Sequence, residues 1–179
     1  YQRKNIDVIV LSFKAHNDYE YEGIKVISLK TYKKQVQNYD ILVCHAVNLN
    51  HHYIFLNKYE KYFKKIFFIF HGHEILKINE VYTPEYKWKK NSYIHKFIRP
   101  FYDECKFFMW KRKLDKLLYK SHLIFVSNWL YVRFLYYIHI NPKKLENHIS
   151  IINNSVGDLF EKYDYKYHTS KEYDFITIR

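Results

Sequence analysis

The sequence has few of the residues that loosen or cross-link a chain. It contains only 3 Gly, 3 Pro and 2 Cys in 179 residues. Long flexible linkers are therefore excluded, and we expect short, ordered turns between the secondary-structure elements. Cys44 and Cys105 lie far apart and form no CxxC pair, so the sequence shows no sign of a disulfide framework. This cysteine usage favours a reducing, cytoplasmic compartment.

Long apolar runs are also absent. No run approaches the roughly 20 residues that a helix needs to cross a bilayer, and residues 1–5 (YQRKN) do not resemble a signal peptide. We therefore expect no membrane-spanning segment. Position 1 is not methionine, and residues 173–179 (YDFITIR) read as an unfinished strand. For these two reasons we expect the chain to be a fragment of a longer protein.

Acidic residues are few compared with basic ones. The 18 Asp and Glu are outnumbered by 30 Lys and Arg, which gives a formal net charge of +12. This excess favours anionic partners, namely nucleic acid, phosphorylated ligands or acidic lipid headgroups. The alternative is compositional drift, because Ile, Lys, Asn and Tyr are all abundant. Hydrophobic residues make up 48% of the chain, with 20 Tyr and 14 Phe, which is enough to fill the core of one domain.

The apolar runs that are present predict the strands of a sheet. Residues 6–12 and 24–29 are β-branched runs joined by a polar connection that contains glycine. Residues 39–45 and 66–71 are more continuously apolar, as is typical of strands buried in a parallel sheet. Between them, apolar residues recur at helical spacing from Phe55 to Ile66. The order strand, helix, strand predicts right-handed parallel crossovers.

The stretch 77–120 has no strand pattern and is the most polarised part of the chain. It holds 12 Lys and Arg, 5 Asp and Glu and 11 aromatic residues. We expect a loop followed by one or two helices, the second of them spanning about 102–119. The residues on its inner side are predicted to be Phe107, Trp110, Leu114 and Leu117.

The alternation of strand and helix then resumes. Residues 123–126 predict a strand, Ser127 a helix N-cap, and residues 129–138 a helix that ends before Asn141-Pro142. Residues 149–152 predict the last strand. The complete pattern predicts an α/β fold with a Rossmann-like parallel sheet and helices on both faces.

The predicted domain organisation follows from these elements. Residues 1–157 form the Rossmann-like domain, and residues 77–120 are a basic, aromatic helical insertion in it. Residues 158–172 have no apolar period, which suits a connection between domains. Residues 173–179 then begin a further strand.

Four segments at strand ends carry histidine or small polar residues. They are residues 39–46 (YDILVCHA), 68–74 (FIFHGHE), 124–130 (IFVSNWL) and 152–160 (INNSVGDLF). In their order and approximate spacing they resemble the N-terminal domain of retaining glycosyltransferases of family 4, the group 1 glycosyltransferases with the GT-B fold. In the last segment this sequence departs from the family at three positions: Asn153 replaces a Pro, Ser155 a Gly and Gly157 an Asp.

The resemblance implies transfer of a sugar from a nucleotide-sugar donor to a saccharide or lipid-linked acceptor, in surface polysaccharide or glycoconjugate biosynthesis. In that family the acceptor lies on the N-terminal domain and the donor mainly on a C-terminal one, whose opening strand residues 173–179 resemble. The family's first strand with its Gly-rich turn, and the paired glutamates of the donor domain, have no counterpart here. We therefore expect the fragment alone to be inactive. The nucleotide-sugar is a substrate, and the resemblance implies neither a cofactor nor a metal.

His71 is the candidate catalytic residue. The resemblance implies that a histidine at this strand end contacts the transferred sugar, and Gly72 permits close approach of backbone or ligand. The alternative is a histidine that closes the strand by binding a neighbouring loop. His73 and Glu74 are candidates for orienting His71 or contacting the acceptor. We expect no metal site, because alternating residues on a strand point to opposite faces and no third ligand is evident.

Five other residues are candidates for binding substrate. His45 and Asn48 follow one strand and would line the acceptor side, with loop capping as the alternative. Ser127 would present its hydroxyl and a helix N-terminus to an anionic group, or serve as an ordinary N-cap. Asn154 and Ser155 would shape the crevice between domains, or simply form a turn.

The basic aromatic stretch predicts a docking surface. Its candidate residues would bind an anionic membrane at about 1 kcal/mol per basic residue, which would place the protein on the inner face of the plasma membrane. They are Lys87, Trp88, Lys89, Lys90, Lys96, Arg99, Trp110, Lys111, Arg112 and Lys113. A solvated basic face is the alternative. Nucleic acid is the weaker candidate partner, because no nucleic-acid-binding motif occurs in the sequence.

Two rival functions stay open at this point. The first is a non-catalytic basic α/β module that binds nucleic acid or an anionic membrane. Salt-sensitive binding to single strands would support it. The second is a GT-B glycosyltransferase of another family, which inversion of the anomeric centre would identify.

Overall fold

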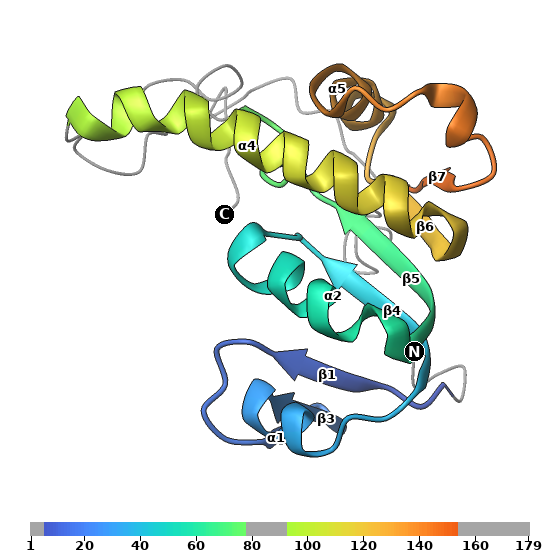
Figure 1. Ribbon diagram of the computed structural model, residues 1–179. Helices are drawn as coiled ribbons and strands as arrows, with labels where there is room; N and C mark the ends of the chain where they lie inside the picture. The colour runs from blue at the N-terminus through green and yellow to red at the C-terminus, as the bar shows by residue number, and fades with distance from the viewer. Residues whose placement is uncertain (1–5, 78–92, 154–179) are drawn as a thin grey trace, which may run out of the picture.

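The computed structural model of the chain describes residues 6–77 and 93–153 (Figure 1). Several predictions concern residues outside these ranges: the domain connection at 158–172, the strand at 173–179, and the first part of the basic insertion. The described residues form two β-sheets together with the helices that pack on them.

The larger sheet has four strands, all parallel, in the order β4-β5-β6-β7. The strands are β4 (Tyr39–His45), β5 (Phe63–Phe70), β6 (Ser121–Phe125) and β7 (Ile149–Ile151). Their order in the sheet is their order in the chain, so each crossover moves one position in the same direction. The prediction of an α/β fold with a Rossmann-like parallel sheet is confirmed.

The smaller sheet has the order β1-β3-β2. Strand β1 (Ile9–Ser12) lies parallel to β3 (Ile24–Ser28), and β2 (Tyr19–Tyr21) lies antiparallel to it. The hairpin between β2 and β3 has a two-residue loop, Glu22-Gly23, with φ angles of 49° and 74°. Positive φ at both positions is the geometry of the tight turn that matches strand twist. Strand β2 was not predicted from the sequence.

The helices connect the parallel strands. After β3 comes α1 (Leu29–Lys34), and after β4 come a π-helical turn η2 (Leu49–Tyr53), α2 (Ile54–Tyr59) and a 3₁₀ turn η3 (Glu60–Tyr62). Helix α4 (Tyr93–Leu117) and the 3₁₀ turn η5 (Leu118–Lys120) precede β6. Helix α5 (Asn128–Ile138) and the 3₁₀ turn η6 (Pro142–Lys144) precede β7.

Aromatic side chains fill the core between the larger sheet and its helices. Phe68 of β5 contacts Trp110 of α4 with ring centroids 6.2 Å apart. Phe70 contacts Phe134 of α5 at 5.5 Å, and Phe125 of β6 contacts the same ring at 5.0 Å. All five rings are fully buried. Burial of each large apolar side chain contributes about 1.5–3 kcal/mol, so these contacts fix α4 and α5 against the sheet.

Both helices lie on one face of this sheet. Phe68 and Phe70 are two residues apart on one strand, so they point to the same face, and they contact α4 and α5 respectively. On the other face, Ile41 and Val43 of β4 remain exposed. The two long helices of the described residues therefore share a face.

The helix predicted between the second pair of strands is shorter than expected. The pattern from Phe55 to Ile66 indicated one helix, but α2 ends at Tyr59 and β5 begins at Phe63. Phe63 and Ile66 are both buried strand residues. A spacing of three residues satisfies a helical pattern even where the chain is extended, so periodicity alone placed the boundary wrongly.

Helix α4 is longer than predicted but has the predicted inner side. It begins at Tyr93 and includes Pro100, whereas the predicted helix began only at about residue 102. The four residues predicted to face inward are all buried: Phe107, Trp110, Leu114 and Leu117.

Candidate functional site

A cavity lies where β4 and β5 end. It has a volume of about 290 Å³ and is lined from the loops after these strands and from α4. The lining residues are Ala46, Val47, Asn48, Leu49, His71, His73, Glu74, Tyr102 and Lys106. The C-terminal ends of parallel strands are where open α/β sheets bind ligands. The cavity therefore occupies the position that the fold favours for a site.

Two predicted residues meet beside it: His71, which lines the cavity, and His45, which contacts His71 but does not itself line the cavity. His45 is the last residue of β4 and pairs in register with Ile69, two residues before His71. The Nδ1 atom of His45 lies 3.5 Å from Nε2 of His71, with ring centroids 5.8 Å apart. Only one of two facing imidazole nitrogens can carry the shared proton. Partial burial, and then the charge of His71, lower the pKa of His45, which favours the neutral form of its ring.

Glu74 holds the turn that follows β5. Its Oε1 accepts a hydrogen bond from the backbone N–H of His71 at 3.0 Å, and its Oε2 accepts one from Gly72 at 2.6 Å. Gly72 has φ = 148°, which a residue with a side chain rarely adopts. The carboxylate is only 6% exposed. Such charge-assisted bonds are strong, so Glu74 fixes the backbone from which His71 projects.

Asn48 caps the turn on the other side of the cavity. Its Oδ1 accepts from the backbone N–H of His51 at 2.8 Å, and its own N–H points to Nδ1 of His52 at 3.4 Å. The capping interpretation of Asn48 is therefore confirmed, and Asn48 also lines the cavity. Burial, helped by the neighbouring His51, lowers the pKa of His52 to about 4. The neutral ring can thus accept this bond.

Helix α4 supplies two lining residues that were missed in the sequence, Tyr102 and Lys106. The ammonium group of Lys106 is buried and donates to Asp103 Oδ1 at 2.8 Å and to the backbone oxygen of Leu76 at 3.1 Å. The sequence did offer a signal for Lys106: it lies three residues after Asp103, close enough on a helix to form an ion pair, and next to the inward-facing Phe107. These bonds tie α4 to the loop after β5.

Ser127, another predicted substrate-binding residue, does not line this cavity. Ser127 caps α5, since its Oγ accepts from the backbone N–H of Leu130 at 3.2 Å. The N-cap interpretation is confirmed. Asn154 and Ser155 lie outside the described residues.

The predicted membrane surface needs correction at two positions. Trp110 and Lys113 are 2% and 5% exposed, because both face the core, and the Lys113 ammonium binds Glu60 Oε2 at 3.2 Å. Neither can contact a membrane in this fold. Lys87, Trp88, Lys89 and Lys90 lie outside the described residues, and of Lys96 and Arg99 only the helical backbone is described.

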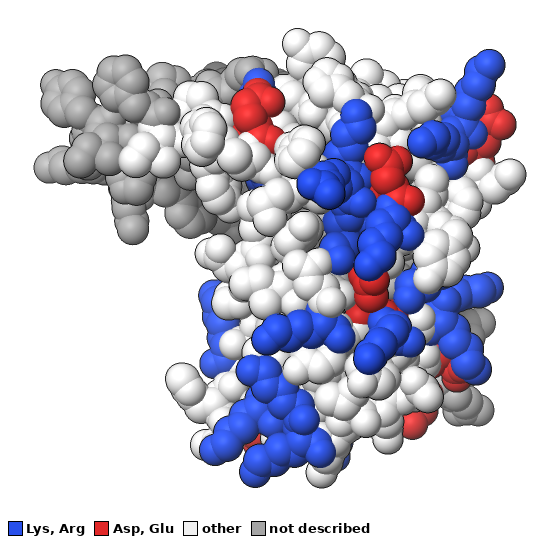
Figure 2. Space-filling view, in the orientation of Figure 1, with Lys and Arg blue, Asp and Glu red and all other residues white. Residues whose placement is uncertain are grey.

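Basic residues nevertheless gather on one face of the molecule. Figure 2 shows lysine and arginine side chains over α1 and over the C-terminal part of α4. Lys30, Lys33 and Lys34 belong to α1 and are exposed. Lys111 and Arg112 of α4 are at least partly exposed. Part of the net charge predicted from composition therefore lies on the helical side of the molecule.

The described residues contain neither a candidate metal site nor a helix that could span a membrane. Across residues 6–77 and 93–153, no three His, Cys, Asp or Glu side chains are grouped closely enough to hold a metal ion. Within the same ranges, no helix combines the length and apolar character required to cross a bilayer.

Fold and site together define an α/β protein with a Rossmann-like parallel sheet and a histidine-edged cavity at the C-terminal strand ends. Comparison of the chain with protein-family models, curated proteins and solved structures found no match.

Proposed function

We propose that the chain is the acceptor-side domain of a retaining GT-B glycosyltransferase. The whole enzyme transfers a sugar from a nucleotide-sugar donor to a saccharide or lipid-linked acceptor, and the chain by itself is expected to be inactive. The observation that carries the proposal is the contact between His45 and His71, from two of the four segments that resemble family 4, beside a cavity that His71 lines. Their side chains are 3.5 Å apart although 26 positions separate them.

In this function His71 contacts the transferred sugar. An imidazole nitrogen that is free to donate or accept is suited to a sugar hydroxyl, which does both. Neutral His45 orients the His71 ring through their contact, and Glu74 fixes the His71 backbone. The cavity volume of about 290 Å³ is at the lower end for small-molecule sites. It suits a single sugar unit, with the nucleotide held elsewhere.

The test is a transfer assay with the natural full-length polypeptide. Labelled nucleotide-sugars are offered with saccharide and lipid-linked acceptors, and the anomeric configuration of the product is determined by NMR. We expect retention, and a loss of about 100-fold or more in His71→Ala. His16→Ala is the matched control, because His16 is an exposed histidine that lies far from His71 in the sequence. The proposal fails if no donor is used, if the product is inverted, or if both variants retain equal activity.

A second part of the proposal concerns location. The exposed apolar stripe on α4 formed by Ile98, Phe101 and Phe108 supports binding of the protein to an anionic membrane. Phe101 and Phe108 are 72% and 60% exposed, and Ile98 precedes them on the same side of the helix. The Arg112 guanidinium lies over the Phe108 ring at 5.6 Å. Aromatic residues bordered by cations are typical of interfacial helices. This stripe replaces Trp110 and Lys113 as the contact surface.

Vesicle sedimentation tests this location. We expect the chain to bind vesicles with anionic phosphatidylglycerol and not those of phosphatidylcholine alone, with weaker binding at high salt. The double variant Phe101→Ser, Phe108→Ser should lose most binding. Tyr119→Ser, at an equally exposed aromatic residue on η5, should not. If a single-stranded oligonucleotide binds more tightly than the vesicles, the nucleic-acid module becomes the better account.

A further inference from the structure

The charged side chains at the cavity after β4 and β5 are already bound within the protein. Its lining includes one acidic residue, Glu74, and one basic residue, Lys106. The two Glu74 oxygens accept from backbone N–H groups at 3.0 and 2.6 Å. The Lys106 ammonium donates to Asp103 Oδ1 at 2.8 Å and to the Leu76 backbone oxygen at 3.1 Å. Glu74, Lys106 and Asp103 are 6%, 6% and 2% exposed, so their charges are balanced inside the fold.

An anionic ligand is therefore poorly matched to this cavity. It would meet the Glu74 carboxylate in the lining, with Asp103 behind it, and an ammonium group that is already bonded. A buried charge without a partner is far more costly than a buried hydroxyl that finds a hydrogen bond. Other polar groups of the lining, on Asn48, His71 and Tyr102, carry no fixed charge. Amide, imidazole and phenol groups suit hydroxyl groups.

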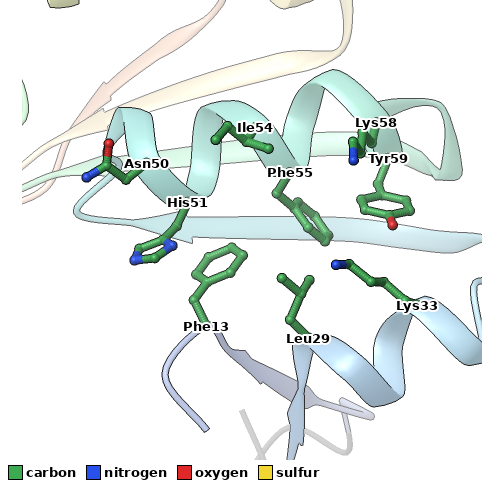
Figure 3. A pocket seen from close by; sticks show the side chains of 9 residues that line it. All are labelled: Phe13, Leu29, Lys33, Asn50, His51, Ile54, Phe55, Lys58 and Tyr59. Carbon is green, nitrogen blue, oxygen red and sulfur yellow. The ribbon is translucent and has the colours of Figure 1, made fainter. Parts of the chain in front are cut away.

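Cations without acidic partners lie elsewhere. Figure 3 shows a hollow of about 80 Å³ between the end of β1, α1 and α2, and this hollow shares no lining residue with the larger cavity. Lys33 and Lys58 border it, and no acidic side chain of the described residues pairs with either. An anionic group thus finds its cations at this hollow, and not at the ends of β4 and β5.

The rest of the larger cavity is apolar. Ala46, Val47 and Leu49 line it from the loop after β4, and Tyr102 lines it from α4. Tyr102 is 41% exposed, so its ring is accessible to a ligand. A sugar ring has C–H faces and a hydroxyl edge, and it can therefore lie against an apolar wall while its hydroxyl groups bond to polar side chains. Small-molecule sites commonly combine apolar walls with a few polar groups in this way.

The backbone is strained at the apolar wall. Ala46 has φ = 48°, in the left-handed region, which costs about 1–2 kcal/mol for a residue with a Cβ atom. Its N–H donates to the Ile69 oxygen at 3.2 Å, which keeps the loop joined to β5. Strain of this kind is concentrated at ligand sites. The methyl group of Ala46 also occupies little of the cavity.

We propose that the sugar bound in this cavity is uncharged, and that Tyr102 positions it by providing the surface on which the ring lies. Uronic acids and phosphorylated sugars are rejected, because the cavity offers their anions no unbonded ammonium group. This inference rests on the proposed function for the presence of a sugar. It adds the charge class of that sugar and a role for Tyr102.

Binding of matched methyl glycosides to the chain, followed by NMR, tests the charge class. The pairs are glucoside with glucuronide, galactoside with galacturonide and mannoside with mannuronide. The members of a pair differ by one carboxylate. We expect a neutral glycoside to shift the ring signals of His71 and Tyr102, and its acidic partner to have a Kd about tenfold higher or more. The His51 signal reports binding at the hollow of Figure 3 separately.

Variants of Tyr102 test its positioning role. Tyr102→Phe keeps the ring and should keep binding, whereas Tyr102→Ala should weaken binding of the neutral glycoside about tenfold. Tyr136→Ala is the matched control, because Tyr136 is 62% exposed on α5 and should not matter. Tyr102→Lys adds a cation and should narrow the difference between neutral and acidic glycosides, which a purely structural role would leave unchanged.

The outcomes separate this inference from the proposed transferase activity. The inference is overturned if acidic glycosides bind as tightly as neutral ones, if no glycoside shifts His71, or if Tyr102→Ala binds normally. The transfer assay decides the activity independently. Transfer of an acidic sugar would overturn the inference and leave the activity standing, whereas glycoside binding without any transfer would do the reverse.

Discussion

The turn that presents His71 depends on the Glu74 carboxylate, and Glu74→Gln tests this dependence. The substitution preserves size and removes one oxygen. At present the two carboxylate oxygens accept separately from the N–H groups of His71 and Gly72, at 3.0 and 2.6 Å. A glutamine can keep one of these bonds with its carbonyl oxygen. Its NH₂ group then faces the other backbone N–H, and two donors cannot bond to each other.

The expected cost follows from this geometry. Glu74 is only 6% exposed, so water cannot fully replace the lost acceptor. A hydrogen bond to a charged group contributes about 1.5–3 kcal/mol, and leaving a buried N–H unpaired has a similar cost. We expect the free energy of unfolding to fall by about 2–3 kcal/mol. At a slope of about 2 kcal/mol per molar urea, the unfolding midpoint falls by about 1 M or more.

Urea unfolding followed by tryptophan fluorescence measures this shift. Glu104→Gln is the matched control, because it makes the same chemical change in a side chain that is 63% exposed and paired with Lys77 at 2.6 Å. An exposed ion pair contributes about 0.2–1 kcal/mol, so the control should move the midpoint little. Equal shifts in the two variants would refute the role assigned to Glu74.

Three other substitutions test separate contacts. Glu60→Gln leaves the buried Lys113 ammonium without its charge partner, and we expect urea unfolding to show a loss of about 3 kcal/mol; an unchanged midpoint contradicts this. The buried Tyr32 hydroxyl has no hydrogen-bond partner among described residues, so Tyr32→Phe should not lower the thermal midpoint. Burial lowers the pKa of His52 from 6.5 to about 4. The unfolded ring therefore protonates first, and stability is lost as pH falls from 6.5 toward 4, by about 1–2 kcal/mol after allowance for partial exposure. His52→Asn should flatten this dependence in unfolding curves across that range.

Features set by local chemistry could be predicted from the sequence. The nearly continuous apolar runs at β4 and β6 identified parallel strands, but the expected burial of β4 was wrong, because Ile41 and Val43 are exposed on one face of the sheet. The Ser127 cap was predictable because it depends on a hydrogen bond to Leu130, only three residues away. The inward side of α4 was predictable for the same reason, since helical spacing alone determines which residues share a face.

Features set by contacts between distant segments could not be predicted in the same way. Lys113 lies in a run of three basic residues, and only the position of Glu60, 53 residues earlier, explains why it is buried. Lys106 likewise binds the Leu76 backbone, which is 30 residues away. Strand β2 has three exposed residues, YEY, and therefore carries no burial pattern to detect. The composition gave the net positive charge of the chain, but it could not show which lysine and arginine side chains are exposed to solvent.

The two histidines of the candidate site are held by different means. Strand β4 ends in His45, which contacts His71 at the end of β5, and Glu74 fixes the backbone of His71. Among the described strands β4 is paired on one side only, with β5. A strand paired on one side opens more easily than one paired on both, because fewer backbone hydrogen bonds hold it. The position of His45 therefore depends on how firmly β4 stays paired with β5, whereas the position of His71 depends on the turn that Glu74→Gln disturbs.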